Sequence, residues 1–173
     1  MLTNLDFQPI ETVACDALIV VGFETTPPIV SAGAELYESN EFAGKPLDLA
    51  LLHRPVGLQA RRLLLIGGGK PDKFNAALLR RSAGAALRHL KSKSFRNIAM
   101  LLDTGFSGAE HVAAAVEGAI LGDFESDALK SDKKDVKTVD RFTVVVPAEM
   151  LDSRLRGAGE RYSANRKTSR ERW

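Results

Sequence analysis

A run of three glycines and a lysine is the part of this sequence that comes closest to a phosphate-binding loop: Gly67, Gly68, Gly69 and Lys70. It follows an apolar run and precedes a helical pattern, which is the setting that such a loop requires. A Walker A loop also needs four residues between its glycines and a Ser or Thr after the lysine, and Pro71 stands there. A dinucleotide fingerprint needs glycine at its sixth position, where Asp72 stands. We therefore favour a tight glycine turn over a phosphate site, and keep these residues as a candidate ligand loop.

A second candidate loop, DTGFSG, follows the apolar run 97–102 and includes Asp103, Thr104 and Gly105. Ligands of α/β sheets usually bind beyond the carboxyl ends of the strands, where this loop is expected. The triplet DTG also occurs in aspartic proteases, whose mechanism needs two carboxylates that share a proton. This chain has one such motif. We therefore interpret the segment as a loop that caps the next helix and offers candidate ligand contacts.

The other groups that catalyse reactions in enzymes are scattered along the sequence. His53, His89 and His111 lack metal-ligand spacing, and there is neither an HExxH nor a GxSxG motif. His89 and His111 are predicted to face solvent from helices. Cys15 is interpreted as a small buried hydrophobe. Without a nucleophile–base pair, an independent small hydrolase is the least favoured function.

The elements that would position the two loops alternate between buried strands and helices. Apolar runs predict strands at 5–10, 17–21, 47–53, 61–66, 97–102 and 141–146, and helical spacing predicts helices at 29–37, after Pro71 to Leu90, and at 109–121. The first strand alternates with polar residues and contains Pro9, which favours an edge position, whereas 17–21 is typical of a central strand. This alternation predicts a three-layer α/β/α sandwich around a mixed, mostly parallel sheet.

The two long helices are each predicted to bury one stripe of side chains. In the first helix the stripe is Leu79, Ala83, Ala86 and Leu90, with Asp72 or Asn75 as its N-cap. In the second helix the residues at helical spacing are Val112, Ala113, Val116 and Ile120.

Composition and charge indicate one globular domain with a basic appendage. The 173 residues carry a net charge of +2, and residues 151–173, with seven basic against three acidic residues, account for +4, which leaves −2 for the rest. A helical pattern starts near Ala148 with the stripe Leu151, Leu155, Ala158 and Tyr162, after which apolar residues nearly vanish. The sequence shows no signal peptide and no membrane span, and its one cysteine fits a reducing cytoplasm.

Two separated motifs in the right order resemble the N-terminal domain of the leucyl (cytosol) aminopeptidase family. They are residues 66–91, IGGGKPDKFNAALLRRSAGAALRHLK, and residues 111–134, HVAAAVEGAILGDFESDALKSDKK, and the strand RFTVVVP follows them. The second motif preserves the family's order of Glu117, Gly118, Leu121, Gly122, Phe124 (usually Tyr), Asp127, Lys130 and Ser131.

The resemblance implies a macro-domain-like fold and a parent enzyme that removes N-terminal residues, preferably leucine, from peptides. In the family two divalent metals, zinc or manganese, are held by a second, C-terminal domain whose motifs this sequence does not contain. Residues 1–147 are therefore expected to be the N-terminal domain, and 148–173 a linker helix and the truncated start of the catalytic domain. This chain is expected to be inactive alone, to partner that catalytic domain in a cytoplasmic hexamer, and to meet peptide substrate only through the parent.

A macro-like binding module is the alternative function. Macro-like folds hold ADP-ribose or nucleotides at strand carboxyl ends, here at 22–26, 67–70 and 103–108. Some members of the resembled family also bind DNA through this domain. The −2 charge of the body disfavours DNA, and only the arginines of the C-terminal segment favour it.

Overall fold

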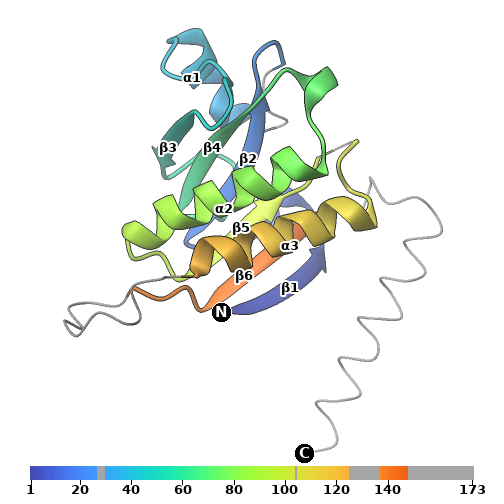
Figure 1. Ribbon diagram of the computed structural model, residues 1–173. Coiled ribbons are helices and arrows are strands. Elements are labelled where there is room, and N and C mark those ends of the chain that lie inside the picture. The colour runs from blue at the N-terminus through green and yellow to red at the C-terminus, as the bar shows by residue number, and fades with distance from the viewer. Residues whose placement is uncertain (27–29, 104, 125–136, 148–173) are drawn as a thin grey trace, which may run out of the picture.

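The computed structural model describes residues 1–26, 30–103, 105–124 and 137–147, which form a six-stranded sheet with helices on both faces (Figure 1). The strands are β1 (Leu2–Phe7), β2 (Ala17–Phe23), β3 (Leu49–His53), β4 (Arg62–Gly69), β5 (Asn97–Leu101) and β6 (Arg141–Val146). The α-helices are α1 (Ala34–Glu38), α2 (Ala76–Ser92) and α3 (Ala109–Asp123). Short 3-10 helices are η1 (Ile10–Thr12), η2 (Ser31–Gly33) and η3 (Pro71–Lys73).

The sheet is mixed and mostly parallel, as the sequence predicts. Its strand order is β1-β6-β5-β2-β4-β3, with neighbouring strands parallel except for β3, which is antiparallel to β4. The predicted edge position of β1 and the central position of β2 are both confirmed. No helix among the described residues is long and apolar enough to cross a bilayer.

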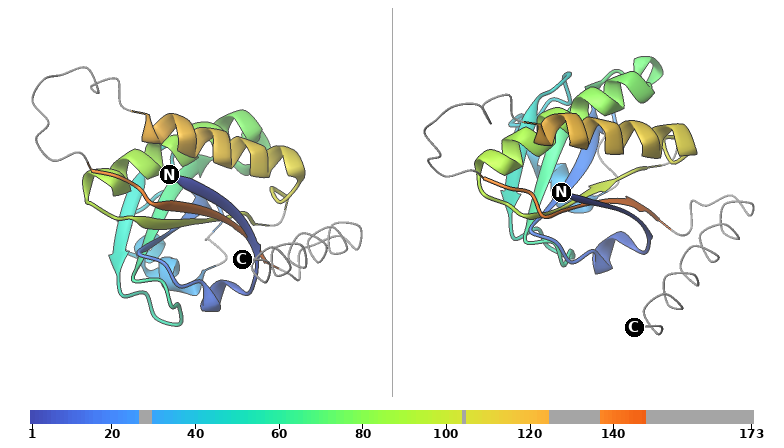
Figure 2. Two further views of the ribbon diagram at one scale, coloured as in Figure 1. Left: turned by 90° about the horizontal axis from the view of Figure 1, so that it is seen from below. Right: turned by 60° about the horizontal axis from the view of Figure 1, so that its bottom comes forward.

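Two hydrophobic layers lie on opposite faces of this sheet. Helices α2 and α3 lie side by side over one face, and α1 covers part of the other (Figure 2). Along β4, Leu64 and Ile66 pack in the cluster under α2 and α3, whereas Leu63 and Leu65 pack in the opposite cluster with Phe42. Alternate side chains of a strand point to opposite faces, so the continuous apolar run that predicted this strand is explained by burial on both sides.

Helix α2 buries the predicted stripe, and Asn75 is its cap. The side-chain oxygen of Asn75 accepts a hydrogen bond from the backbone N–H of Leu78 at 3.1 Å, whereas Asp72 lies earlier, in η3. Leu79, Ala83, Ala86 and Leu90 are each at most 1% exposed. The pattern therefore predicted the buried face correctly and left two candidates for the cap, of which the structure selects one.

Replacing the cap is expected to weaken the fold measurably. Asn75→Ala leaves a backbone N–H of the first turn without its partner, and such changes cost about 1 kcal/mol of stability. Urea unfolding followed by circular dichroism measures this loss. Asp72→Ala is the matched control, because the described contacts give Asp72 no role in the α2 cap, and an equal loss in both variants would contradict the assignment.

The buried face of α3 is not the predicted one. Ala113 and Ile120 are exposed and Val112 and Val116 only half-buried, whereas the helix buries Ala114, Ala115, Gly118, Ala119 and Gly122. The reason is backbone contact with α2: a Cβ at Gly122 would lie 2.6 Å from the carbonyl oxygen of Gly84, and one at Gly118 would clash with the carbonyl of Arg80. Only small residues fit so close a contact. Val112 and Val116 therefore pack only at the margin of the core, and Ile120 and Leu121 are exposed.

Candidate functional site

The two candidate ligand loops lie at the same edge of the sheet. Lys70 follows β4, Asp103 lies just beyond β5, and β2, which ends at Phe23, lies between these parallel strands. The chain leaves β2 towards α1 on one face, and leaves β4 and β5 towards α2 and α3 on the other. Ligands of open α/β sheets bind at such a point, so this edge is the candidate site. Thr104 lies outside the described residues.

The glycine run forms the end of strand β4 rather than the predicted turn. Gly67 donates its N–H to the carbonyl of Asp48 at 2.8 Å and accepts from the N–H of Leu47 at 2.8 Å. Gly69 donates to the carbonyl of Gly44 at 2.9 Å. These bonds attach the segment 44–48 to β4, and the chain turns only after Gly69. Lys70 is exposed.

Steric room explains why glycine is needed at this place. A Cβ at Gly67 would clash with the backbone carbonyl of Lys45, and Gly69 has a φ of +78°, which side chains rarely adopt. A phosphate loop must present unpaired backbone N–H groups to its anion. The N–H groups of Gly67 and Gly69 already bond to the chain itself, so the run serves close packing of the backbone.

Aromatic side chains fill the space beyond the neighbouring strands. The ring of Phe74 lies 5.1 Å from that of Phe23 and 4.9 Å from that of Phe106, in edge-to-face pairs, and Phe23 and Phe106 are 5.8 Å apart. Phe74 lies after β4, Phe23 is the last residue of β2, and Phe106 lies after β5. Sequence reasoning did not single them out, although one phenylalanine at or soon after each of three parallel strands was a usable signal.

The loop after β5 is held by its own backbone. The N–H of Phe106 donates to the carbonyl of Asp103 at 3.0 Å, and Gly105 has a φ of +89°. The loop thus turns at Gly105 and directs Phe106 back into the aromatic cluster, and α3 begins at Ala109. The segment leads into α3 as predicted, but the predicted cap has no side chain in it, because the N-cap residue is Gly108 and no side-chain cap hydrogen bond forms there.

His111 is packed against this cluster, contrary to the predicted solvent-facing position. Its side chain is 13% exposed and its ring lies 5.5 Å from that of Phe106. The Nδ1 atom is buried without a hydrogen-bond partner, since the carboxylate of Glu110 is 3.9 Å away. The prediction failed because it placed His111 outside the buried stripe of α3, whereas the first turn of the helix lies against Phe106.

Cys15 is a free, partly buried cysteine just before β2. Burial raises the pKa of its thiol to about 12, and the neighbouring Asp16 adds to the shift. Thiolate is the reactive form, so at pH 8 we expect Ellman's reagent to label native protein far more slowly than protein unfolded in urea. Rapid labelling of the native chain would contradict the protected position.

The described residues do not contain the ingredients of a metal centre. Within residues 1–26, 30–103, 105–124 and 137–147, no three His, Cys, Asp or Glu side chains gather in a way that could hold a metal ion.

Comparison with known proteins identifies the chain's relatives. Residues 29–133 match the model of the cytosol aminopeptidase family, N-terminal domain. A probable cytosol aminopeptidase of Solibacter usitatus (strain Ellin6076) is 42% identical over 153 residues, which is 88% of this chain and 32% of that protein. The chain spans about a quarter to a third of the length of the curated relatives it matches.

Solved structures show the same fold. A tomato leucine aminopeptidase mutant superposes with a TM-score of 0.65 at 21% identity, over 91% of this chain and 35% of that one. A Trypanosoma brucei macrodomain in complex with ADP-ribose superposes with a TM-score of 0.57 at 16% identity, over 83% and 63% of the two chains. The fold is therefore the macro-domain-like α/β/α sandwich that the sequence predicts. Together with the family match over 29–133, it shows that this chain belongs to the cytosol aminopeptidase family, as its N-terminal domain.

Proposed function

We propose that this chain is a non-catalytic accessory domain of a cytoplasmic aminopeptidase, which assists oligomer assembly and shapes access to the active site. The observation that carries the proposal is the match of residues 29–133 to the N-terminal domain of the family. The two hydrophobic clusters on opposite faces of the sheet support a folded accessory domain.

In this proposal residues 1–147 are the accessory domain, and residues 148–173 lead into a catalytic domain of the same polypeptide. That domain would hold two divalent metals, zinc or manganese, and would remove N-terminal residues, preferably leucine, from peptides. We expect the present chain alone to release no p-nitroaniline from leucine p-nitroanilide, with Zn²⁺ or Mn²⁺ present.

A chimera tests the accessory role. The N-terminal third of the Solibacter usitatus relative is replaced by this chain, which aligns with it at 42% identity. We expect the chimera to keep the relative's oligomeric mass by light scattering and its aminopeptidase turnover, whereas a version without any N-terminal domain loses both. If the shortened enzyme assembles and turns over normally, the domain has no part in assembly or access.

The fold is compatible with the ADP-ribose alternative, but the contacts at the carboxyl ends of the strands do not favour it. The N–H groups of Gly67 and Gly69 are bonded to segment 44–48, and the rings of Phe23, Phe74 and Phe106 pack together beyond the strands. We therefore expect no heat of binding in calorimetry with millimolar ADP-ribose, with an ADP-ribose-binding macrodomain as positive control. Saturable heat that disappears in Lys70→Ala would establish the binding module instead. DNA binding would have to come from the arginines of the C-terminal segment and to weaken steeply with salt.

A further inference from the structure

Strand β1 is an open edge of the sheet that the described residues form. It pairs with β6 on one side, and none of the described strands lies on its other side. Soluble proteins usually protect such an edge with lysine or proline, with a bulge, or by keeping the strand very short. The six residues of β1, LTNLDF, contain neither lysine nor proline, and Asp6 is their only charged residue. This edge is therefore suited to pairing with another strand.

The hydrogen bonds of β1 show which of its backbone groups face the open side. The N–H of Leu2 donates to the carbonyl of Asp140, the residue before β6, at 2.8 Å. Backbone groups point alternately to the two sides of a strand, so the even-numbered residues of β1 bond towards β6. The odd-numbered residues Thr3, Leu5 and Phe7 therefore direct their N–H and carbonyl groups outwards.

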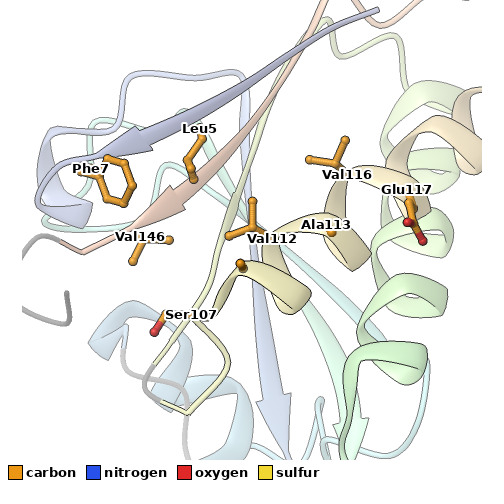
Figure 3. Close-up of a pocket in the computed structure, with 9 residues that line it drawn as sticks. Leu5, Phe7, Ser107, Val112, Ala113, Val116, Glu117 and Val146 are labelled. Atoms are coloured by element: carbon orange, nitrogen blue, oxygen red, sulfur yellow. The ribbon is translucent and has the colours of Figure 1, made fainter. Parts of the chain in front are cut away.

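An apolar groove follows the same edge, between β1 and helix α3 (Figure 3). Leu5 and Phe7 of β1 and Val146 of β6 form one side of the groove, α3 forms the other, and its volume is about 440 Å³. Where α3 borders the groove it carries the small residues Ala109 and Ala113. Parallel sheets are normally covered by helices on both faces, so this edge of the sheet has room for a further layer of side chains.

The same side of α3 continues beyond the groove with large residues. Ile120 and Phe124 are 53% and 74% exposed, and helical spacing places them on one side of α3 with Ala109 and Ala113. Helix α3 connects the parallel neighbours β5 and β6, so it runs antiparallel to the strands. The groove with its small residues therefore lies towards the carboxyl end of β1, and the large residues lie towards its amino end.

We propose that a second copy of the chain occupies this edge, with the two β1 strands antiparallel about a twofold axis at Leu5. The axis reverses the two ends of the surface, so Ile120 and Phe124 of each copy face the groove beside Ala109 and Ala113 of the other. Large residues then oppose small ones on both sides of the axis. One surface serves both copies, as a twofold interface requires.

The side chains of β1 fit this pairing. With Leu5 of the two copies opposite each other, Thr3 of one copy lies opposite Phe7 of the other, and Asn4 lies opposite Asp6. In the single chain the carboxylate of Asp6 accepts from the N–H of Phe7 at 2.9 Å. In the pair this carboxylate accepts from the side-chain amide of Asn4 of the other copy, and the N–H of Phe7 donates to the carbonyl of Thr3.

Charge and the alternative register favour the same arrangement. The neighbouring antiparallel register places Asn4 opposite Asn4 and sets the carboxylate of Asp6 against the apolar side chain of Leu2, which gives it no donor. Residues 1–150 carry a net charge of only −2, so two copies repel each other weakly. The paired surface is smaller than the roughly 800 Å² per partner of a standard interface, so we expect a weak dimer with a micromolar or weaker dissociation constant. The pairing is a property of this chain and does not rest on the proposed accessory role.

Sedimentation equilibrium of the full 173-residue chain, from low micromolar to millimolar concentration, is the first test. We expect a monomer–dimer equilibrium. Asn4→Asp sets two carboxylates opposite each other and is expected to weaken the dimer about tenfold, whereas Asn4→Lys is expected to strengthen it about tenfold. Urea unfolding of both variants verifies that each is folded. A monomer at every concentration, or a change of the same sign in both variants, would overturn the proposal.

Disulfide trapping then tests the register. In a Cys15→Ala background, Leu5→Cys brings two Cα atoms across the axis to about 5.5 Å, within the range that a disulfide spans. Thr3→Cys is the matched control on the same side of the strand, because its counterpart in the other copy lies opposite Phe7. We expect mild oxidation to yield disulfide-linked dimers of Leu5→Cys and not of Thr3→Cys. Preferential trapping of Asn4→Cys would contradict the register, and trapping of none of them would mean that something other than a second copy covers this edge.

Discussion

Gly118→Ala is expected to lower the free energy of unfolding by about 3 kcal/mol, the upper part of the usual range for overpacking a core. The added Cβ would clash with the backbone carbonyl oxygen of Arg80 and lie 3.0 Å from the Cβ of Ala83. Neither atom can move without shifting α2. Urea unfolding measures the loss, and the native protein should show shifted near-ultraviolet circular dichroism, because α2 leads from Phe74 and α3 carries His111 against Phe106.

Steric clash and helix propensity predict opposite signs for the change in the free energy of unfolding, so the measurement separates the two effects. Alanine is a better helix former than glycine by up to about 1 kcal/mol, so helix propensity alone predicts stabilisation. Ala113→Gly, at an exposed position of the same helix, measures the size of that propensity effect. If Gly118→Ala stabilises the protein by as much as Ala113→Gly destabilises it, the close contact between α2 and α3 is wrong.

The same contact explains what the sequence could and could not predict about α3. Its bounds were predicted within two residues, because helical spacing and Gly108 were visible in the sequence. The prediction of its buried face was wrong. Ranking the residues of the helix by hydrophobicity selects Val112 and Val116 as buried, rather than Gly118 and Ala119. The distance between two helices decides which residues are buried, and that distance is a property of the pair. A spacing of small residues, Gly118 and Gly122 against Gly84, was the signal that could have corrected the prediction.

The central strands were predicted well because they are buried on two faces, whereas the first strand, half-exposed at the edge, covers Leu2–Phe7 and not the predicted 5–10, since Pro9 and Ile10 lie beyond its end. Runs such as Leu63–Ile66 have no other simple interpretation once a mostly parallel sheet is assumed. The end of β4 was missed, since glycine normally interrupts a strand, and here it extends one. The reason is the segment 44–48, which approaches from elsewhere in the chain and which no local pattern could reveal.

The place of the candidate site in the fold could be predicted from the sequence, but the residues that surround it could not. Strand order and direction made it predictable that the loops after β4 and β5 share one edge of the sheet. What fills that edge depends on side chains from three separate segments, Phe23, Phe74 and Phe106, and on the backbone of segment 44–48. The aromatic rings and segment 44–48 therefore define what surrounds the candidate loops, and whether these loops bind a ligand stays a prediction for the ADP-ribose titration to test.

Gly67→Ala is the second substitution with a large expected effect, and its effect is expected to be local. The new Cβ would clash with the carbonyl of Lys45 and lie 2.9 Å from the carbonyl carbon of Gly44. Segment 44–48 is a loop and can retreat, so the strain is relieved by breaking the bonds from Leu47 and Gly67 that hold it to β4. We expect a loss of about 3 kcal/mol of stability, together with faster amide hydrogen exchange confined to segment 44–48 and the adjoining end of β4.

Gly57→Ala provides the matched control for this variant. Gly57 lies in a turn with a φ of +79° and nothing within 4 Å of an added Cβ, so its replacement tests backbone strain without a clash. Such strain costs roughly 1–2 kcal/mol, and hydrogen exchange of segment 44–48 should not change. If the amide hydrogens of Leu47 and of position 67 exchange at the same rate in Gly67→Ala as in the unaltered chain, segment 44–48 does not depend on a glycine at this position. In that case the glycine run would again be available as a ligand loop, and the ADP-ribose titration would have to be repeated on the unaltered chain at higher ligand concentration.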